Sequence, residues 1–500
     1  MNAPVSRAVA GAAISAWPDV DAVRRDLDRL VATPLRRPGD AALAGYRAWY
    51  ERNAPGSRAT AAEAARYIPG GVQHNLALNE PWPLDIVRAE GAYLWDVDGN
   101  RYTDFLQAGG PTVLGSNHPA VRERVVELLA DCGPVTGMLH SAEVRLAKLI
   151  HDFMPGVQRF RMLGSGTEGV MAAVRAARAH TGKAHVIKIG GAYHGWSDQV
   201  VYGLRIPGTG GLEAAGIPPG ALELTHEVPP GDLDRLRETL AANEESGGTA
   251  AVLVEPVGPE SGTHLVRPED HAAVRELCDA FGALLVFDEV VTAFRLGMGG
   301  AQGYFGVRPD LTVLGKCVAG GYPAAGGVGG SAEVMAAFEG GLTAAGKRAL
   351  VGGTLSANPL SCVAGYHALV EMDRTGAPAL AGRAGDRLRA GLAARIAARG
   401  LPYVTYNIGS IVHLHTSGVL HLSLDDPELF DKLGPRTDML GQMSMAYSAE
   451  GMVTIAGSRL YTSMAHTDEI IDDALARFDR VLATVDPADP GPGGPSGVGG

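Results

Sequence analysis

The chain has 500 residues, of which 46% are hydrophobic and 6% aromatic, a balance typical of a soluble globular protein with more than one domain. Its 43 lysines and arginines are outnumbered by 55 aspartates and glutamates, so the formal net charge is −12 at pH 7. This balance excludes functions that need a strongly basic surface, and we expect neither a nucleic acid nor a membrane as partner. The apolar runs are also too short and too often interrupted by glycine to span a bilayer.

The four cysteines, Cys132, Cys278, Cys317 and Cys362, lie far apart in the chain. They form neither a Cys-x-x-Cys pair nor the dense spacing of a disulfide-stabilised secreted domain. This usage favours a reducing compartment, so we expect a cytoplasmic protein, and we expect no metal site.

Residues 1–65 predict a helical arm, because apolar residues recur at helical spacing between Val20 and Leu30. In residues 66–355, short apolar runs alternate with helical patterns. Such alternation is typical of an α/β domain in which helices flank a mostly parallel sheet. The predicted strands are 159–163, 185–189, 250–254, 283–287 and 311–314, and the predicted helices include 170–180 and 270–281.

The pattern changes near residue 356. Longer helical stretches at 359–372, 379–399 and 468–484 surround a short strand at 410–415, so residues 356–486 predict a smaller α+β domain. The last residues, 487–500, are rich in proline and glycine and have little apolar surface to bury, so we expect a disordered tail.

A glycine-rich stretch, GSGTEG at 164–169, connects a predicted strand to a predicted helix. Backbone N–H groups at the start of a helix, together with the hydroxyls of Ser165 and Thr167, make an anion site. A dinucleotide fingerprint would also need an acidic residue at the end of the next strand, but that strand ends in Ile189-Gly190-Gly191. The motif therefore favours a single phosphate, and a plain glycine-rich turn is the alternative.

Two ionisable residues follow predicted strands. Asp288 comes after the run 283–287, at a position where open α/β sheets bind ligands; alternatively, it caps the next turn or pairs with Arg295. Lys316 comes after the run 311–314 and is one of only six lysines in the chain. Desolvation by apolar neighbours favours the neutral, nucleophilic form of a lysine amine, which attacks aldehydes. The alternative is an exposed surface lysine.

These features together match the requirements of pyridoxal 5′-phosphate, whose phosphate binds at a helix start, whose ring nitrogen pairs with an acid and whose aldehyde forms a Schiff base with a lysine. We assign the phosphate to Ser165, Gly166 and Thr167, the ring nitrogen to Asp288 and the Schiff base to Lys316. Tyr193, which follows the strand at 185–189, is placed to stack on the ring; alternatively, it packs within its loop. A nicotinamide-dependent oxidoreductase is the rival from another class, and the missing ribose acid argues against it. A homologue that binds the cofactor without turnover is a further alternative.

Several motifs resemble those of class III aminotransferases, in particular the glutamate-1-semialdehyde 2,1-aminomutase branch. They are YIPGGV (67–72), GAYLWDVDG (91–99), GSNHP (115–119), SGTE (165–168), YHG (193–195), VEPV (254–257), FDEV (287–290), LGK (314–316) and GTLSANP (353–359). The resemblance implies fold type I and a homodimer with the active site at the interface. It also implies that Tyr193, His194 and Glu255 lie at the cofactor and that Val290 covers one face of its ring. Thr354 is implied to reach the phosphate of the neighbouring subunit's cofactor.

Two departures from the aminomutase pattern concern the substrate. The aminomutase carries an arginine for the substrate carboxylate after PGGV, whereas residues 73–78 here contain none, and its glutamate near the C-terminus is replaced by Ser458. We therefore predict that Arg459, the next residue, binds the carboxylate; the alternative is a surface arginine. The predicted activity is an aminotransferase that uses Lys316, Asp288 and Tyr193 as catalytic residues. It would act on an amino acid or amine and a keto acid or aldehyde, and an aminomutase or racemase is the alternative.

Overall fold

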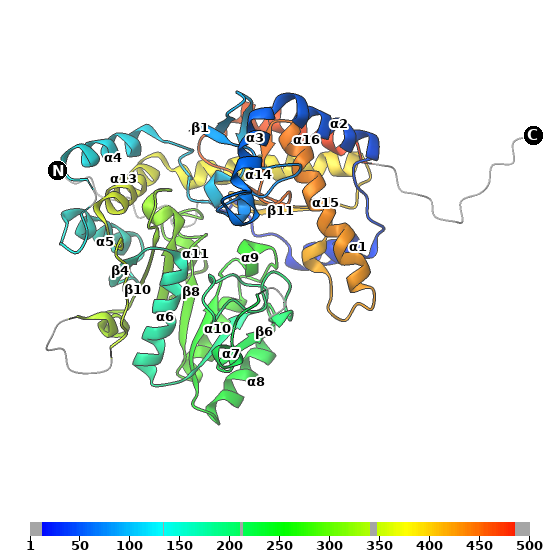
Figure 1. Ribbon diagram of the computed structural model, residues 1–500. Coiled ribbons are helices and arrows are strands. Elements are labelled where there is room, and N and C mark those ends of the chain that lie inside the picture. Colours follow the sequence, from blue (N-terminus) through cyan, green and yellow to red (C-terminus); the bar gives the residue numbers. More distant parts are fainter. Residues whose placement is uncertain (1–12, 134, 211–213, 341–347, 486–500) are drawn as a thin grey trace, which may run out of the picture.

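The computed structural model describes residues 13–133, 135–210, 214–340 and 348–485. Within these ranges the strands form sheets of seven, four and three strands. Figure 1 shows the seven-stranded sheet and its helices on one side of the molecule and the N-terminal helices packed with the C-terminal part of the chain on the other. The tail predicted at 487–500 lies outside the described residues.

The seven-stranded sheet is mostly parallel, as the sequence predicts. Its order is β4-β10-β9-β8-β7-β5-β6. Strand β10 runs antiparallel to both neighbours, whereas the pairs from β9 to β6 are parallel. The strands are β4 (Arg159–Leu163), β5 (His185–Ile189), β6 (Thr225–Val228), β7 (Thr249–Val254), β8 (Leu284–Asp288), β9 (Leu311–Gly315) and β10 (Gly326–Gly330).

Helices cover both faces of this sheet. Successive side chains of a strand point to opposite faces, and accordingly Val286 packs in the cluster that contains helix α6. Leu285 and Phe287 pack in the cluster that contains α8 and α10. This two-sided burial explains why the strands are almost continuously apolar. The helices of this region are α6 (Gly166–Thr181), α7 (Pro219–Leu222), α8 (Leu233–Glu244), α9 (Pro259–Gly262), α10 (Asp270–Ala280), α11 (Gly300–Phe305) and α12 (Ala332–Met335).

Strand β10 is absent from the sequence prediction. Its sequence is GGVGG, and glycine has a low strand propensity, so no apolar alternation marks it. The structure supplies the reason for glycine: a Cβ on Gly326 would lie 2.0 Å from the carbonyl carbon of Ser165. Glycine therefore allows β10 to approach the start of α6 closely.

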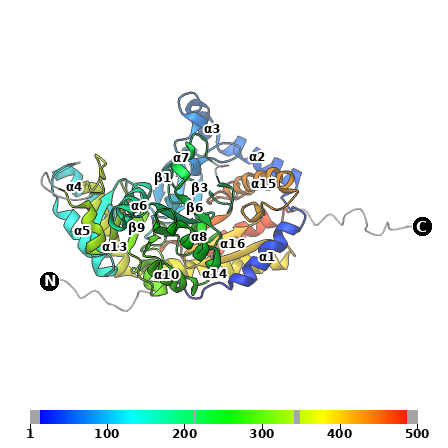
Figure 2. The same ribbon diagram turned by 90° about the horizontal axis from the view of Figure 1, so that it is seen from below.

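A second helical layer consists of α4 (Pro119–Asp131), α5 (Ser141–Phe153) and α13 (Pro359–Thr375). Helix α13 packs against both α4 and α5 and against the turn that begins at Lys316. In Figures 1 and 2 these three helices lie together at one end of the molecule. Their buried side chains form one cluster with Leu314 and Cys317, so this layer supports the segment that carries Lys316.

The smaller domain contains the three-stranded sheet β11-β12-β14, and the four-stranded sheet joins strands β1, β2 and β3 to β13. The N-terminal helices pack on this part of the chain, because α1 contacts β11 and α2 contacts α15. The helices are α1 (Val20–Ala32), α2 (Asp40–Asn53), α3 (Pro55–Ala64), α14 (Ala377–Ala398), α15 (Leu429–Ala449) and α16 (Asp468–Leu482). The strands are β1 (Ile86–Glu90), β2 (Tyr93–Asp96), β3 (Arg101–Asp104), β11 (Val404–Ile408), β12 (Ile411–His415), β13 (Met452–Val453) and β14 (Arg459–Tyr461).

Helices in the described ranges are all too short or too polar to cross a membrane.

Candidate functional site

Most of the residues selected from the sequence gather at one edge of the large sheet, where the carboxyl ends of its parallel strands meet. The loop 164–169 follows β4, Tyr193 follows β5, and Glu255 follows β7. Asp288 ends β8 opposite Val313 of β9, and Lys316 comes directly after β9.

The glycine-rich loop forms the start of helix α6. Ser165 is the N-cap residue, and its Oγ accepts a hydrogen bond from the backbone N–H of Glu168 at 3.2 Å. The carboxylate of Glu168 accepts the N–H of Gly164 at 2.8 Å. The N–H groups of Gly166 and Thr167 have no acceptor among the described residues. Two backbone donors at a helix N-terminus are therefore available to an anion.

The glycines around this loop allow close approaches. A Cβ on Gly166 would lie 2.7 Å from Cγ2 of Val290, and a Cβ on Gly315 would lie 2.8 Å from Cγ1 of the same valine. Val290 therefore lies between the start of α6 and the end of β9. Gly195, with φ +95°, comes so close to Thr167 that a Cβ would lie 2.4 Å from its Oγ1. The loop after β5, which contains Gly195, therefore packs directly against the glycine-rich loop 164–169.

Asp288 is paired with His194. The Nδ1 atom of His194 lies 2.8 Å from Oδ2 of Asp288, and both side chains are almost completely buried. Burial lowers the pKa of His194 despite the neighbouring carboxylate, so the ring is neutral and its Nδ1–H donates to Asp288. The other oxygen, Oδ1, accepts the N–H of Val290 at 3.1 Å. The pairing of Asp288 with Arg295 that the sequence left open is not formed.

The carboxylate of Glu255 binds backbone N–H groups of Tyr193 and of the loop that follows β7. Its Oε1 accepts the N–H of Tyr193 at 2.8 Å and that of Glu260 at 3.1 Å, and its Oε2 accepts the N–H of Ser261 at 2.8 Å. Burial, with Asp288 and Glu260 nearby, raises the pKa of Glu255 to about 8. Tyr193 is 48% exposed, so its ring is presented at the sheet edge while its backbone is held.

Lys316 begins a short 3-10 turn, Lys316–Ala319, and has a left-handed φ of +43°. Its backbone is therefore strained, which often marks a functional position. Lys316 is half-buried, whereas Lys188, in β5, is fully buried, and its ammonium group donates to the backbone carbonyls of Ala192, Val200 and Tyr202. That network makes Lys188 a structural lysine.

Arg459 forms an ion pair that the sequence analysis missed. Its Nη1 donates to the backbone carbonyl of Glu260 at 2.6 Å, and its Nη2 lies 3.2 Å from Oε2 of Glu260. Glu260 and Ser261 have left-handed φ values of +54° and +58°. Glu260 lies five residues after Glu255 in the loop that follows β7, and this position at a strand end is the signal that marks it.

Within the described ranges, no hydrogen bond joins Thr354 to the other candidate residues. It is exposed, in the loop that precedes α13. The adjacent Gly353, with φ +137°, lies near Glu168, because a Cβ on it would be 3.3 Å from Oε2.

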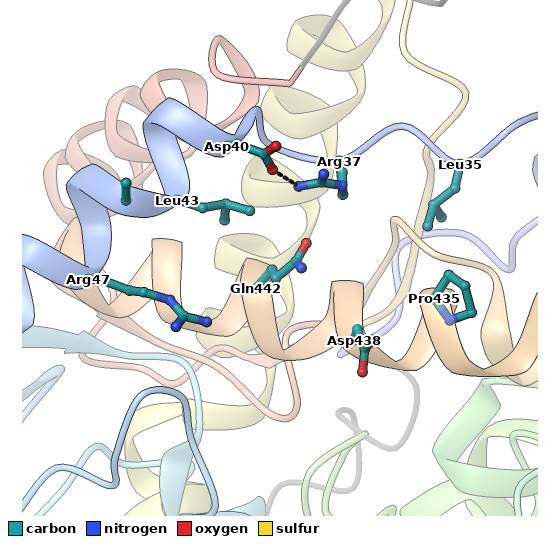
Figure 3. A pocket seen from close by; sticks show the side chains of 9 residues that line it. Leu35, Arg37, Asp40, Leu43, Arg47, Pro435, Asp438 and Gln442 are labelled. Atoms are coloured by element: carbon teal, nitrogen blue, oxygen red, sulfur yellow. Dashed lines mark ion pairs between the residues drawn. The ribbon is translucent and has the colours of Figure 1, made fainter.

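A surface groove of about 510 Å³ lies elsewhere, between α2 and α15 (Figure 3). Its charged side chains include Arg37 and Asp40, which form an ion pair at 2.7 Å. None of the residues predicted from the sequence lines this groove. The sheet edge, and not this groove, therefore carries the candidate chemistry.

Comparisons with known proteins identify relatives of the chain as a whole. A family model described as aminotransferase class-III matches residues 77–400. A glutamate-1-semialdehyde 2,1-aminomutase from Syntrophobacter fumaroxidans is 39% identical over 363 residues, 70% of this chain and 80% of that protein. The structure of a β-phenylalanine aminotransferase from Variovorax paradoxus is similar with a TM-score of 0.76 and 31% identity, and the match covers 90% of this chain and 100% of that one. A transaminase with PLP bound is 28% identical with a TM-score of 0.75, covering 86% of this chain and 97% of that one.

Proposed function

Because the chain belongs to the class-III aminotransferase family, we propose that it moves an amino group between an amino acid or amine donor and a carbonyl acceptor. It is an enzyme of the aminotransferase and aminomutase group, and its cofactor is pyridoxal 5′-phosphate.

One observation carries the proposal: free backbone donors, the Asp288–His194 pair and Lys316 converge at one sheet edge. The N–H groups of Gly166 and Thr167, with the hydroxyls of Ser165 and Thr167, fit the phosphate. Asp288 would hold the ring nitrogen, Lys316 would carry the covalent link, and Val290 and Tyr193 would contact the ring. When bound, the cofactor withdraws electrons from the carbon that loses its proton.

The protein's own groups then have distinct tasks. With the cofactor bound, a donor amine would displace the amine of Lys316, and the free amine would take the proton from the carbon that bears the amino group and pass it to the cofactor. Asp288 would keep a proton on the ring nitrogen. His194 holds the Asp288 carboxylate in place through Nδ1–H.

Arg459 is the proposed site for a substrate carboxylate. Its guanidinium offers parallel donors that match a carboxylate, and its present partner, Glu260, belongs to the loop held by Glu255. A substrate carboxylate would replace the Glu260 side chain on Nη2. A donor without a carboxylate would leave the Arg459–Glu260 pair intact.

An aminomutase or racemase is the second candidate, favoured by the aminomutase relative. Against it, residues 73–78 contain no arginine for the substrate carboxylate. The two activities differ in stoichiometry, because an aminotransferase needs a second, carbonyl substrate for each turnover and an isomerase does not.

We also propose a homodimer with Thr354 at the interface. Large apolar side chains are exposed on and beside the layer formed by α4, α5 and α13, and exposed apolar side chains that gather on one face are typical of an interface. These side chains are Val126, Leu129, Met138, Leu139, Val144 and Leu355. A cytoplasmic location is proposed on the basis of four unpaired cysteines.

The test is a visible spectrum of the purified protein, followed by borohydride reduction and peptide mapping. We expect a yellow protein with the cofactor trapped on Lys316. Turnover is then measured with a panel of amino donors, with and without a keto acid. A colourless protein that traps no cofactor would contradict the proposal, and turnover to an isomer without any keto acid would establish the second candidate.

A further inference from the structure

The backbone that faces Lys316 adopts an uncommon conformation. Four successive residues, 107–110, have left-handed φ values of +48°, +53°, +83° and +118°. Two of them, Gln107 and Ala108, are not glycine. L-residues rarely take this conformation in succession, and such a turn persists only where the surrounding structure holds it.

This left-handed turn is held at both ends. At its start, Oδ1 of Asp104 accepts the N–H groups of Leu106 at 3.0 Å and Gln107 at 2.8 Å. At its end, the carbonyl of Gly110 accepts hydrogen bonds from Nε of Arg295 at 3.0 Å and from Nη2 at 2.6 Å. The guanidinium group therefore fixes the orientation of the last peptide of the turn.

That peptide lies against the side chain of Lys316. A Cβ on Gly110 would lie 3.5 Å from Cδ of Lys316 and 3.3 Å from Cε2 of Tyr461. The turn and the tyrosine ring thus form a wall beside the aliphatic stem of the lysine. The guanidinium carbon of Arg295 lies 4.7 Å from the centre of the Tyr461 ring, so the same residue contacts both parts of the wall.

Arg295 also joins this wall to the smaller domain. Its Nη1 donates to Oγ of Ser410 at 2.8 Å and to the carbonyl of Thr462 at 3.0 Å. The side chain is fully buried, and all of these acceptors are neutral. A buried cation without a carboxylate partner is costly. The guanidinium group is planar and donates to three separate segments, at Gly110, Ser410 and Thr462. Neither an apolar side chain nor a lysine could make this set of hydrogen bonds.

We propose that Arg295 is a positioning residue for Lys316. By holding Gly110 against the lysine stem and Tyr461 next to Gly110, it restricts the amine to the geometry that transfers the proton to and from the substrate carbon. This inference rests on the proposed function of Lys316.

The test uses Arg295→Met and Arg295→Lys in the loaded enzyme, with Arg436→Met as the matched control. Arg436 is also a buried arginine that donates to backbone carbonyls, those of Val31, Thr33 and Ser417, and it makes no hydrogen bond to the turn 107–110. Each variant is assayed with the best donor and with the same donor deuterated at the carbon that bears the amino group. Thermal unfolding and the visible cofactor band are recorded in parallel.

We expect both Arg295 variants to lose about 10- to 100-fold in kcat with little change in KM, the size of effect that a small misplacement of a catalytic group produces. Their kinetic isotope effect should rise above that of the wild type, because proton transfer becomes slower. Arg295→Lys retains the charge, so an equal loss in both variants would assign the effect to geometry. Arg436→Met should lose stability without a change in the isotope effect.

An isotope effect and kcat in the Arg295 variants that match Arg436→Met would overturn the inference. If Arg295→Met does not fold, Arg295→Lys and the milder Ser410→Ala decide the question by the same isotope effect. A wild-type protein that traps no cofactor on Lys316 would instead contradict the proposed function, so the two failures are distinguishable.

Discussion

Replacing Arg459 by methionine tests the class of substrate. The guanidinium now binds Glu260 through its backbone carbonyl at 2.6 Å and its carboxylate at 3.2 Å. A hydrogen bond to a charged group contributes about 1.5–3 kcal/mol, and about 1.4 kcal/mol corresponds to a factor of ten. Arg459→Met should therefore raise KM for a donor with a carboxylate by about 10- to 100-fold. KM for a simple amine should change little, and the visible band of the cofactor should not change.

The same substitution affects stability, which the design must separate from binding. The side chains of Arg459 and Glu260 are each only 17% exposed, so Arg459→Met leaves a carboxylate largely buried without its partner. Removing one member of a buried ion pair costs about 3–5 kcal/mol, and the partial exposure here lowers that figure. The double variant Arg459→Met/Glu260→Gln removes both charges. It should recover most of the stability and none of the affinity for the carboxylate.

The assay compares steady-state kcat and KM for an amino acid and for the amine that lacks its carboxylate, in the wild type and three variants. Glu260→Gln alone should lower KM for the amino acid, because it removes the group that competes for Arg459. Equal losses for both donors in Arg459→Met would show that the residue supports the fold or the dimer. No loss with either donor would refute carboxylate binding by Arg459.

Three further outcomes follow from the site. Lys316→Ala should abolish turnover and the visible band, because Lys188 is held by backbone carbonyls; a cofactor adduct that borohydride still traps in this variant would contradict the assignment. Asp288→Asn should keep the fold but lower turnover about 100-fold or more, the scale for one preorganised electrostatic group, and normal turnover would leave Asp288 a structural role. Burial raises the pKa of Glu255 from 4.5 to about 8, so the folded protein holds a proton that the unfolded chain releases between these values. Its contribution to stability is present below pH 4.5 and is lost as the pH rises through 8. Urea unfolding should show that Glu255→Gln lacks this pH dependence, and parallel curves for variant and wild type would disprove it.

The sequence by itself determined the fold class and the positions of the candidate residues at strand ends. Buried parallel strands need continuous apolar runs, and their carboxyl ends meet at one edge, so Asp288 and Lys316 could be recognised as neighbours although 28 positions separate them. The glycine-rich loop before α6 was recognised for the same reason, because a strand, a turn and a helix start are all encoded locally.

The tertiary structure alone decided which groups pair. His194, 94 positions away, binds Asp288 in place of Arg295, and Glu260, 199 positions from Arg459, takes up its guanidinium. Strand β10 likewise could not be predicted from the sequence, because its glycines lack the apolar pattern of a strand and instead allow a close approach to α6. These choices depend on loop conformations such as the left-handed backbone at Glu260 and at residues 107–110. Such conformations are stabilised by residues that are distant in the sequence, Arg295 among them. Local patterns of apolar and polar residues cannot predict which distant residues these are.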